Sequence, residues 1–516
     1  MTNRREQIEP VVVNAEQMRQ IEERIFAAGI PVAALMEKVA GLIATRMIAL
    51  YPHSERSRVG VIVGPGHNGG DALVVARELH LRGYQVSLYR PIDKLKELTS
   101  SHANYAASLG MPFHEDIQSL RHCELVIDGL FGFGQTRSLS GNLAEAVNQL
   151  NQWSQPVVSI DLPSGIQTDT GEVLGTAIQA TRTFCLGLWK LAFFQDQALP
   201  YLGEAELIDF GIPPWDIWSI ISHPPQIQQI TATAAREYLP LPRPKVTHKY
   251  KQGHLLVVGG SRRYAGGVIV TGLGARASGA GMLSVAVPES LRSILVTQLP
   301  EALIVGCPET ETGAIAQLPP EASDLSQFSA ITCGPGLTRD AHPLVKTLLE
   351  VDTPLVLDAD GLNILAQMGA KGGRREAATV LTPHPGEFKR LFPDLPSSTK
   401  DQISAVQAAS RQSGAVVLLK GARSAIAHPG GAVWLLPEST PALARGGSGD
   451  VLTGLIGGLM AQQLPPQPPL EATVATAAWW HAQAGILAAQ ERTELGVDAF
   501  TLSQYLMPAL RSGVEG

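Results

Sequence analysis

The chain has 516 residues and a mass of 54.9 kDa, more than the about 250–300 residues at which a single hydrophobic core usually stops growing, so we expect at least two domains. Apolar residues make up 45% of the chain and charged residues 17%, values that are typical of a folded globular protein and exclude extensive disorder. The formal net charge of −7 provides no overall attraction for nucleic acid or for an anionic membrane surface.

The cysteine pattern and the hydropathy of the chain indicate the cellular compartment in which the protein is expected. The four cysteines stand far apart and form no CxxC pair, which favours reduced thiols over disulfides or a zinc site. No stretch reaches the roughly 18 uninterrupted apolar residues of a membrane helix, and no apolar segment follows the arginines near Met1. We therefore expect a cytoplasmic protein with no membrane partner. The sequence leaves open whether it is a homo-oligomer.

Short apolar runs alternate with helix-like segments along the whole chain. Continuous apolar runs are typical of strands buried on both faces, and their alternation with helices indicates parallel βαβ units. Both halves are therefore predicted to be α/β domains. In the first half the predicted strands cover residues 59–63, 84–88, 124–128 and 156–160, and in the second half 255–258, 282–287, 331–333, 354–358, 380–382 and 415–419.

A proline-rich stretch separates the two halves. Its prolines, within residues 211–225, interrupt both the strand and the helix periodicity. We therefore predict one domain over residues 1–222 and a second over residues 223–516.

A glycine-rich loop, residues 64–71, follows the first predicted strand and precedes a helix predicted over residues 71–81. Glycines there would let backbone N–H groups approach a phosphate, with the helix N-terminus adding a favourable dipole. A tight turn capped by Asp71 is the alternative interpretation. The loop is not a Walker sequence, because no Gly-Lys-Ser/Thr follows, and its glycine spacing differs from the dinucleotide fingerprint.

Two further strand ends in the first half carry the carboxylates Asp128 and Asp161. Parallel α/β sheets bind ligands at the carboxyl edge of their strands, so these ends and the glycine loop form a candidate pocket. Taken singly, each Asp is also explained as a helix cap or a turn former. Asn68, Asp128 and Ser164 are oxygen donors of the kind that a monovalent or divalent cation prefers. Ser164 does not lie in a G-x-S-x-G sequence, which disfavours a hydrolase nucleophile.

Five ordered motifs of the first half resemble the NAD(P)H-hydrate epimerase family, which has a Rossmann-like fold. The resemblance covers about residues 10–220 and is carried by residues 14–18, 35–41, 64–71, 128–134 and 161–165. It implies that a hydrated dinucleotide has Asp161 at its reactive end, and that Asn68, Asp128 and Ser164 hold potassium. It implies that the dinucleotide is bound by His67, Asn68, Gly69, Gly70, Asp71, Gly132, Phe133, Gly134, Gln135, Thr136, Arg137 and Ser138.

The first half departs from this family at two places. His67 stands where the family commonly has Asn, so a side-chain amide contact would be lost while backbone contacts survive. Residues 190–192 read Lys-Leu-Ala where relatives often read Lys-Pro-Gly. No role is therefore carried over to Lys190.

In the second half, the loop 444–449, which ends in the four small residues 446–449, precedes Asp450 and an amphipathic helix. Their N–H groups at the helix N-terminus form an anion site suited to a phosphoryl group in transfer. Asp450 is either a cap or a base that accepts a proton from a substrate hydroxyl; we favour the base, because capping does not require a run of small residues.

Two more strand-end residues are candidates for function. His384 lies between prolines, so its backbone is stiff and suited to positioning a ligand; a loop histidine with satisfied hydrogen bonds is the alternative. Lys420 would neutralise phosphate charge, or else extend from a strand end to solvent.

The second half resembles the NAD(P)H-hydrate dehydratase family of ribokinase-like α/β fold, over about residues 230–510. The resemblance is carried by Gly-Gly-Ser-Gly-Asp, by Thr-Pro-His-Pro-Gly-Glu and by Lys-Gly-Ala. Gly267 departs from the usual Gly-Ala pair, which leaves that contact to the backbone. The implied contacts to the hydrated dinucleotide are Gly267, Gly336, His384 and Asp450, and the implied contacts to the adenine nucleotide are Lys420, Gly421, Ala422, Arg423, Ser424 and Gly449.

Both resemblances together point to the family of bifunctional NAD(P)H-hydrate repair enzymes. Such an enzyme, both isomerase and lyase, would interconvert R- and S-NADHX or NADPHX in its first domain and dehydrate the S form in its second. ADP with Mg²⁺ would supply the energy and become AMP and phosphate. The alternative is a ribokinase-like small-molecule kinase joined to a non-catalytic nucleotide-binding module. The sequence does not decide between ADP and ATP, or between NADH and NADPH.

Overall fold

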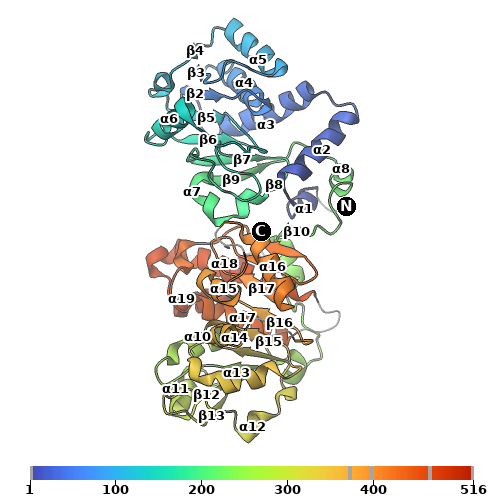
Figure 1. The fold of residues 1–516 in the computed structure, drawn as a ribbon, viewed down its shortest axis with the longest axis vertical. Helices are drawn as coiled ribbons and strands as arrows, with labels where there is room; N and C mark the ends of the chain where they lie inside the picture. Colours follow the sequence, from blue (N-terminus) through green and yellow to red (C-terminus); the bar gives the residue numbers. More distant parts are fainter. Residues whose placement is uncertain (1–3, 370–374, 396–399, 463–467, 513–516) are drawn as a thin grey trace. The chain divides into compact units, whose positions relative to one another are not determined.

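The computed structural model describes residues 4–369, 375–395, 400–462 and 468–512 (Figure 1). The chain forms two compact units, residues 1–226 and 227–516. The structural division lies shortly after residue 222. Every strand predicted from an apolar run is present, with ends within one residue of the expected ones.

The first unit is built on a seven-stranded sheet in which all neighbouring strands are parallel. Its order is β4-β3-β2-β5-β6-β7-β9, and a separate two-stranded sheet pairs β1 with β8. The strands are β1 (Val12–Val13), β2 (Arg58–Val63), β3 (Gln85–Tyr89), β4 (Phe113–His114), β5 (Leu125–Gly129), β6 (Val157–Ile160), β7 (Arg182–Leu186), β8 (Trp189–Lys190) and β9 (Glu204–Ile208).

Helices cover both faces of this sheet (Figure 1). Val61 of β2 packs in one core with α3 and α4, whereas its neighbour Ile62 packs in a second core with α6. Successive strand residues thus point to opposite faces, and both are buried, as the continuous apolar runs predict. The helices are α1 (Arg4–Ile8), α2 (Ala15–Ala27), α3 (Val32–Leu50), α4 (His67–His80), α5 (Glu97–Ser108), α6 (Gly141–Leu150), α7 (Leu199–Leu202) and α8 (Pro214–Trp218).

The second unit has a ten-stranded sheet of order β10-β19-β18-β17-β16-β15-β14-β11-β12-β13. It is parallel except that β18 runs antiparallel to both of its neighbours, which the apolar runs did not predict. The strands are β10 (Ile227–Gln229), β11 (His254–Val258), β12 (Met282–Pro288), β13 (Leu303–Cys307), β14 (Ala330–Cys333), β15 (Leu355–Leu357), β16 (Thr379–Leu381), β17 (Val416–Leu419), β18 (Ala425–Ala427) and β19 (Val433–Leu435).

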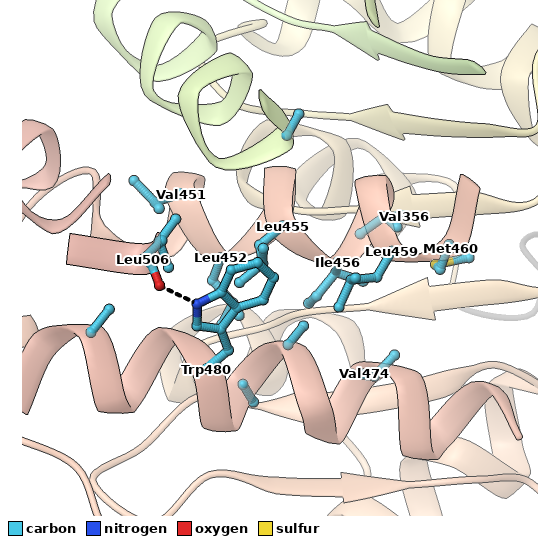
Figure 2. Packing of buried hydrophobic residues seen from close by; sticks show 14 of the residues in the cluster. Val356, Val451, Leu452, Leu455, Ile456, Leu459, Met460, Val474, Trp480 and Leu506 are labelled. Carbon is cyan, nitrogen blue, oxygen red and sulfur yellow. Dashed lines mark hydrogen bonds between the residues drawn. The ribbon is translucent and has the colours of Figure 1, made fainter. Parts of the chain in front are cut away.

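The helix expected after the 444–449 loop is α17 (Ser448–Ala461), and it lies in the core of the second unit. It is buried nearly all round rather than on one side, because α10 and α18 pack against it as well as the sheet (Figure 2). Trp480 packs in this core and donates its indole N–H to the Leu506 carbonyl oxygen. The helices are α9 (Ala232–Glu237), α10 (Ala265–Ala277), α11 (Arg292–Gln298), α12 (Pro320–Ser323), α13 (His342–Leu349), α14 (Ala359–Gln367), α15 (Pro385–Leu391), α16 (Gln402–Ser413), α17, α18 (Leu470–Arg492) and α19 (Ala499–Ser512).

Within the described ranges, no single helix has the length and apolar composition needed to cross a membrane. Only α2 and α3 taken together reach that composition, and a bend of 119° separates them.

Candidate active sites

The first candidate site lies where the strand order of the first sheet reverses. The chain runs outward from β2 to β3 and β4, and then returns to β5 on the other side of β2. The loops after β2 and β5 therefore diverge at the carboxyl edge of the sheet and leave room for a ligand. A cavity of about 720 Å³ lies there, lined by both loops and by Asp161.

The glycine-rich loop turns directly into α4, which begins at His67 rather than at Asp71. Its N-cap is Gly66 and no side chain caps it, so the interpretation of Asp71 as a cap is wrong. A Cβ on Gly69 would lie 2.0 Å from the Gly64 carbonyl oxygen, so this close approach requires glycine. Among the five residues predicted here to bind the dinucleotide, the cavity is lined by His67, Asn68 and Asp71, while Gly69 and Gly70 are buried in the helix.

Asp161 follows β6 and has a φ of 70°, a backbone conformation that residues with a side chain rarely adopt. Its Oδ2 accepts a hydrogen bond from the Phe133 N–H, and its Oδ1 accepts one from the Lys190 ammonium, both at 2.7 Å. The residue is 3% exposed. Such strain persists only where the surroundings enforce it, and it is found disproportionately at functional sites.

Lys190 is the buried counter-ion of Asp161, and sequence reasoning gave it no role. It stands on β8, which pairs with β1 and so carries the lysine into the core. Burial is the largest single influence and by itself would lower the pKa of Lys190, but the charge and hydrogen bond of Asp161 together with the charges of Cys185 and Glu22 outweigh it, so the pKa is raised. The lysine of the family's Lys-Pro-Gly motif is present in the sequence, and it was the available indication of this role. The departure from Lys-Pro-Gly lies in the residues after it, which do not make this contact.

Two other ionisable groups of α4 face the same cavity. Burial raises the pKa of Asp71 well above its usual range, and repulsion from Asp161 and Glu22 adds to the effect. Burial, together with the charge of Lys96, lowers the pKa of His67, which keeps its imidazole neutral at pH 7. The cavity wall thus combines one ion-paired carboxylate with a carboxyl that resists ionisation.

The loop after β5 lines the cavity with its first half. A Cβ on Gly132 would lie 2.9 Å from the Asp161 Oδ2, so the glycine lets the Phe133 N–H reach that carboxylate. The predicted binding residues that line the cavity are Gly132, Phe133, Gly134 and Gln135, whereas Thr136, Arg137 and Ser138 are exposed outside its lining. The roles of the last three stay predictions.

The three predicted potassium ligands adjoin this same loop. Asp128 is fully buried and accepts hydrogen bonds from the Ser164 hydroxyl (2.7 Å), the Ser164 N–H and the Ser159 hydroxyl. Burial raises its pKa although these donors favour the charged form. The buried Asn68 Nδ2 has no hydrogen-bond partner within the described part of the chain. One carboxylate with neutral oxygens fits a monovalent cation better than a divalent one, which usually takes more charged ligands.

The second candidate site occupies the corresponding reversal of the second sheet, between β11 and β14. A Cβ on Gly267, in the first turn of α10, would lie 3.1 Å from the Asp450 Oδ2 and 3.6 Å from the Gly336 nitrogen. Gly336 belongs to the loop after β14. Three segments that are distant in sequence therefore meet at one point.

Asp450 stands in the first turn of α17 but does not cap it. The N-cap is Gly447, and no side-chain hydrogen bond caps the helix, so the capping interpretation is wrong. Burial raises the pKa of Asp450 to about 7, and repulsion from Asp358 exceeds the opposing effect of Lys420. A carboxylate whose pKa lies near neutrality is well matched to general-base catalysis.

Lys420 lies at the N-terminus of α17 instead of extending to solvent. Its ammonium is 2.7 Å from the Asp358 Oδ1, and a Cβ on Gly449 would lie 3.2 Å from it. Asp358 is 1% exposed and also accepts a hydrogen bond from the Thr453 hydroxyl. Sequence reasoning had noted Asp358 only as a strand end. Its place after a buried strand, as for Asp128 and Asp161, was the available signal.

His384 is the N-cap of α15. Its Nδ1 accepts a hydrogen bond from the Gly386 N–H, and the Glu387 carboxylate accepts one from the His384 N–H. The satisfied-histidine interpretation therefore holds for Nδ1. The His384 Nε2 lies 3.5 Å from the Glu387 Oε1, and the side chain is 52% exposed. The other predicted nucleotide contacts, Gly421, Ala422, Arg423 and Ser424, follow Lys420 in the turn between β17 and β18.

Comparison with known proteins identifies the family. A family model described as NAD(P)H-hydrate dehydratase matches residues 255–508, and one described as YjeF-related protein N-terminus matches residues 32–192. A bifunctional NAD(P)H-hydrate repair enzyme of Synechocystis is 56% identical over 97% of this chain and 95% of its own length. One of Thermosynechococcus vestitus is 52% identical over 97% of this chain and 98% of its own length.

The chain belongs to the bifunctional NAD(P)H-hydrate repair enzyme family. The predicted family, the two predicted α/β folds and the enzyme class are thereby confirmed. The first unit is the epimerase domain and the second the dehydratase domain. Among solved structures, the Bacillus subtilis ADP/ATP-dependent NAD(P)H-hydrate dehydratase, co-crystallised with ATP/Mg²⁺, is similar to 55% of this chain and 97% of its own, with 30% identity and a TM-score of 0.47.

Proposed function

We propose that the two sites divide the repair reaction at residue 222: residues 1–222 epimerise the C6 hydroxyl of NADHX or NADPHX, and residues 223–516 dehydrate the S form with ADP. The observation that carries the proposal is the meeting of Asp450, Gly267 and Gly336 at the N-terminus of α17. A base beside exposed helix N–H groups suits the transfer of a phosphoryl group to a hydroxyl.

In the dehydratase domain, Asp450 takes the proton of the C6 hydroxyl as its oxygen attacks the terminal phosphorus of ADP. The N–H groups of residues 446–449 hold the developing negative charge, and AMP leaves. Phosphate then departs from C6 with the bonding electrons, C5 loses a proton, and the ring double bond is restored. His384 Nε2, Gly267 and Gly336 orient the dinucleotide.

The nucleotide is held by the turn after β17 and by the helix terminus. Lys420, already paired with Asp358, is close to Gly449 and so able to balance phosphate charge. Mg²⁺ would arrive with the nucleotide phosphates, because no cluster of three or more metal-ligating side chains occurs in the ranges that the structure describes. When bound, the ion neutralises charge on the transferring phosphoryl group.

In the epimerase domain, Asp161 works at the reactive carbon, and the cavity-lining residues of the loops after β2 and β5 bind the dinucleotide. Potassium would be held by Asn68, Asp128 and Ser164, where it would offset the buried Asp128 charge and fix the loop after β5. Replacing potassium by a large organic cation, or making Asp128→Ala, should then weaken dinucleotide binding to this domain. Unchanged binding in both tests would reduce the three residues to turn formers.

The deciding experiment incubates the protein with a mixture of R- and S-hydrates and ADP. We expect reduced nicotinamide absorbance to return for both epimers, with one AMP and one free phosphate for each molecule repaired. Asp161→Ala should still repair the S form but leave R-hydrate at the spontaneous epimerisation rate. A stable phosphorylated product, without recovered NADH or NADPH, would favour the kinase alternative.

A further inference from the structure

The epimerase cavity is also lined by a carboxyl of helix α2, that of Glu22. Helix α2 presents Met18, Ile21 and Ile25 to the core, and the next helical stripe, Arg19, Glu22 and Phe26, lines the cavity. Glu22 thus faces Asp161 and Lys190 from a separate element of the fold. Three carboxyls therefore line the cavity: Glu22 on α2, Asp71 on α4 and Asp161 after β6.

Glu22 differs from the other glutamates of its helix in its surroundings. Glu16 and Glu23 both pair with Arg19 at the surface. Among the described residues, no hydrogen bond or ion pair is found for the Glu22 carboxyl. The Glu22 side chain has intermediate exposure and lines the cavity, and titratable groups with a perturbed pKa in such clefts are candidates for function.

The charges around Glu22 favour its protonated form. Burial raises the pKa of Glu22 to about 7, with Asp161 adding to the effect and Lys190 opposing it. The charged and titratable groups that line the cavity with it are Arg19 on its own helix, His67 and Asp71 of α4, Lys94 and Lys96, Asp161, and Lys190 of β8. Of these, Asp161 and Lys190 act on Glu22, and Glu22 in turn raises the pKa of Asp71.

Inverting a carbon that bears a hydroxyl requires proton transfer twice. The hydroxyl must be protonated to leave as water, and a water that adds to the other face of the ring must lose a proton. One fixed carboxylate reaches one face of a bound ring. An acid and a base on different walls of a cavity can protonate the departing hydroxyl and deprotonate the water that adds to the other face.

We propose that Glu22 is a second catalytic residue of the epimerase, the acid that protonates the departing C6 hydroxyl while Asp161 accepts the proton of the water that adds. This inference rests on the proposed epimerase function of the first unit. Because the reaction is reversible, the two carboxyls exchange roles in the opposite direction.

The step balances without any further reagent. The C6–O bond breaks as the Glu22 carboxyl gives its proton to the oxygen, and the N1 lone pair forms the N1=C6 bond of a cyclic iminium. Water then adds to C6, its proton goes to Asp161, and the N1=C6 electrons return to nitrogen. Proton transfer from Asp161 to Glu22 restores the starting state.

The test compares Glu22→Gln with Glu23→Gln in the full-length protein. Glutamine keeps the shape of Glu22 but cannot give up and regain a proton, so R-to-S conversion should fall about 10²–10⁴-fold. Binding of the hydrates to the first unit should change little, which serves as a check on its folding, and dehydration of S-hydrate by the second unit should be unaffected. Glu23 lies on the exposed side of α2, so its variant should epimerise at the wild-type rate.

The pH profile separates a catalytic from a structural role. Wild-type epimerisation should decline as pH rises through about 7, because Glu22 then loses the proton it must donate, and this limb should vanish in Glu22→Gln. In Glu22→Ala, added formate should restore part of the rate by entering the vacated space, whereas chloride should not. Glu22→Asp should keep part of the activity.

Two results would overturn the inference. One is a Glu22→Gln protein with the wild-type rate and pH limb; the other is a slow Glu22→Ala protein that formate does not rescue and whose pH limb persists. Failure of the epimerase function itself looks different, because wild-type protein would then convert R-hydrate no faster than a protein-free control.

Discussion

Replacing Lys190 should lower both the stability and the activity of the first unit. It is fully buried and pairs with Asp161, so Lys190→Met leaves a buried carboxylate without its counter-ion. Breaking such a pair costs about 3–5 kcal/mol of folding free energy. We expect that loss in urea unfolding of the first unit, together with loss of R-hydrate conversion. Lys190→Arg keeps the charge and should lose less stability.

At the second site, the ionisation of Asp450 should control the dehydratase rate. A base must be unprotonated to act, and the pKa of Asp450 is about 7, so the rate should rise as pH increases through that value. Asp450→Asn should lower the rate about 10²–10⁴-fold at pH 8. Because Asp450 does not cap α17, the variant should retain its circular dichroism spectrum and its melting temperature. Near-normal turnover by the folded variant would refute the assignment.

His481 of α18 contacts the first turn of α17, the helix that carries Asp450. Its Nε2 is 2.9 Å from the Ser448 carbonyl oxygen, so α18 anchors the first turn of α17. Burial lowers the pKa of His481 to about 4, below the ordinary value of 6.5. The unfolded chain therefore binds more protons in this interval, and the stability of the second unit should decline as pH falls from about 6.5 towards 4.

The His481 anchor is tested by His481→Leu, which removes a hydrogen bond worth about 0.5–1.5 kcal/mol. The acid-induced loss of stability should shrink in this variant, and dehydration of S-hydrate should slow because the first turn of α17 is less firmly held. His481→Gln keeps a donor and should retain more activity. An unchanged pH dependence of stability in His481→Leu would contradict the role given to this histidine.

Among the elements, α10 and α17 determine where Asp450 lies, and they pack unusually closely. A Cβ on Gly454 would lie 1.9 Å from the Thr271 carbonyl oxygen, and one on Gly274 would lie 2.1 Å from that of Val451. Glycine at these crossing points lets the two backbones approach. Asp450 and Gly267, one on each helix, come within reach of the same substrate as a result.

Gly454→Ala should therefore force the helices apart at a cost of about 1–3 kcal/mol, measured by urea unfolding, and should slow dehydration without changing epimerisation. Gly41→Ala is the matched control, because Gly41 is a helical glycine of α3 with nothing within 4 Å of an added Cβ. It should stabilise the first unit by up to about 1 kcal/mol through helix propensity.

At the scale of the whole molecule, each unit has its own sheet and its own hydrophobic core. Residues 1–226 and 227–516, produced separately, should each fold. The first should interconvert the hydrates without ADP, and the second should repair S-hydrate only. Mixing them should restore repair of R-hydrate, which coupled absorbance assays would follow. A fragment that fails to fold would show that its core needs the other unit.

Strands that form long apolar runs could be predicted from the sequence, whereas very short strands could not. Val61 and Ile62 point to opposite faces of the sheet, and both are buried, so β2 was visible as an apolar run. The short strands β1 and β8 were missed, because two residues carry no periodicity. That gap hid Lys190, which stands on β8 and pairs with Asp161. Asp71 and Asp450 were read as alternative caps because sequence does not reveal where a helix starts to within a turn.

The sequence by itself determined the α/β architecture, the family, and the glycine-rich strand ends where both sites lie, because these depend on local periodicity and on motifs that are contiguous in the chain. Only the tertiary structure decided which side chains face one another. Glu22 comes to the Asp161 cavity from α2, and Asp358, which follows β15, comes to Lys420 and Asp450. The charge interactions and pKa values of these groups depend on distances in space and on burial, and neither can be obtained from the separation of residues along the chain.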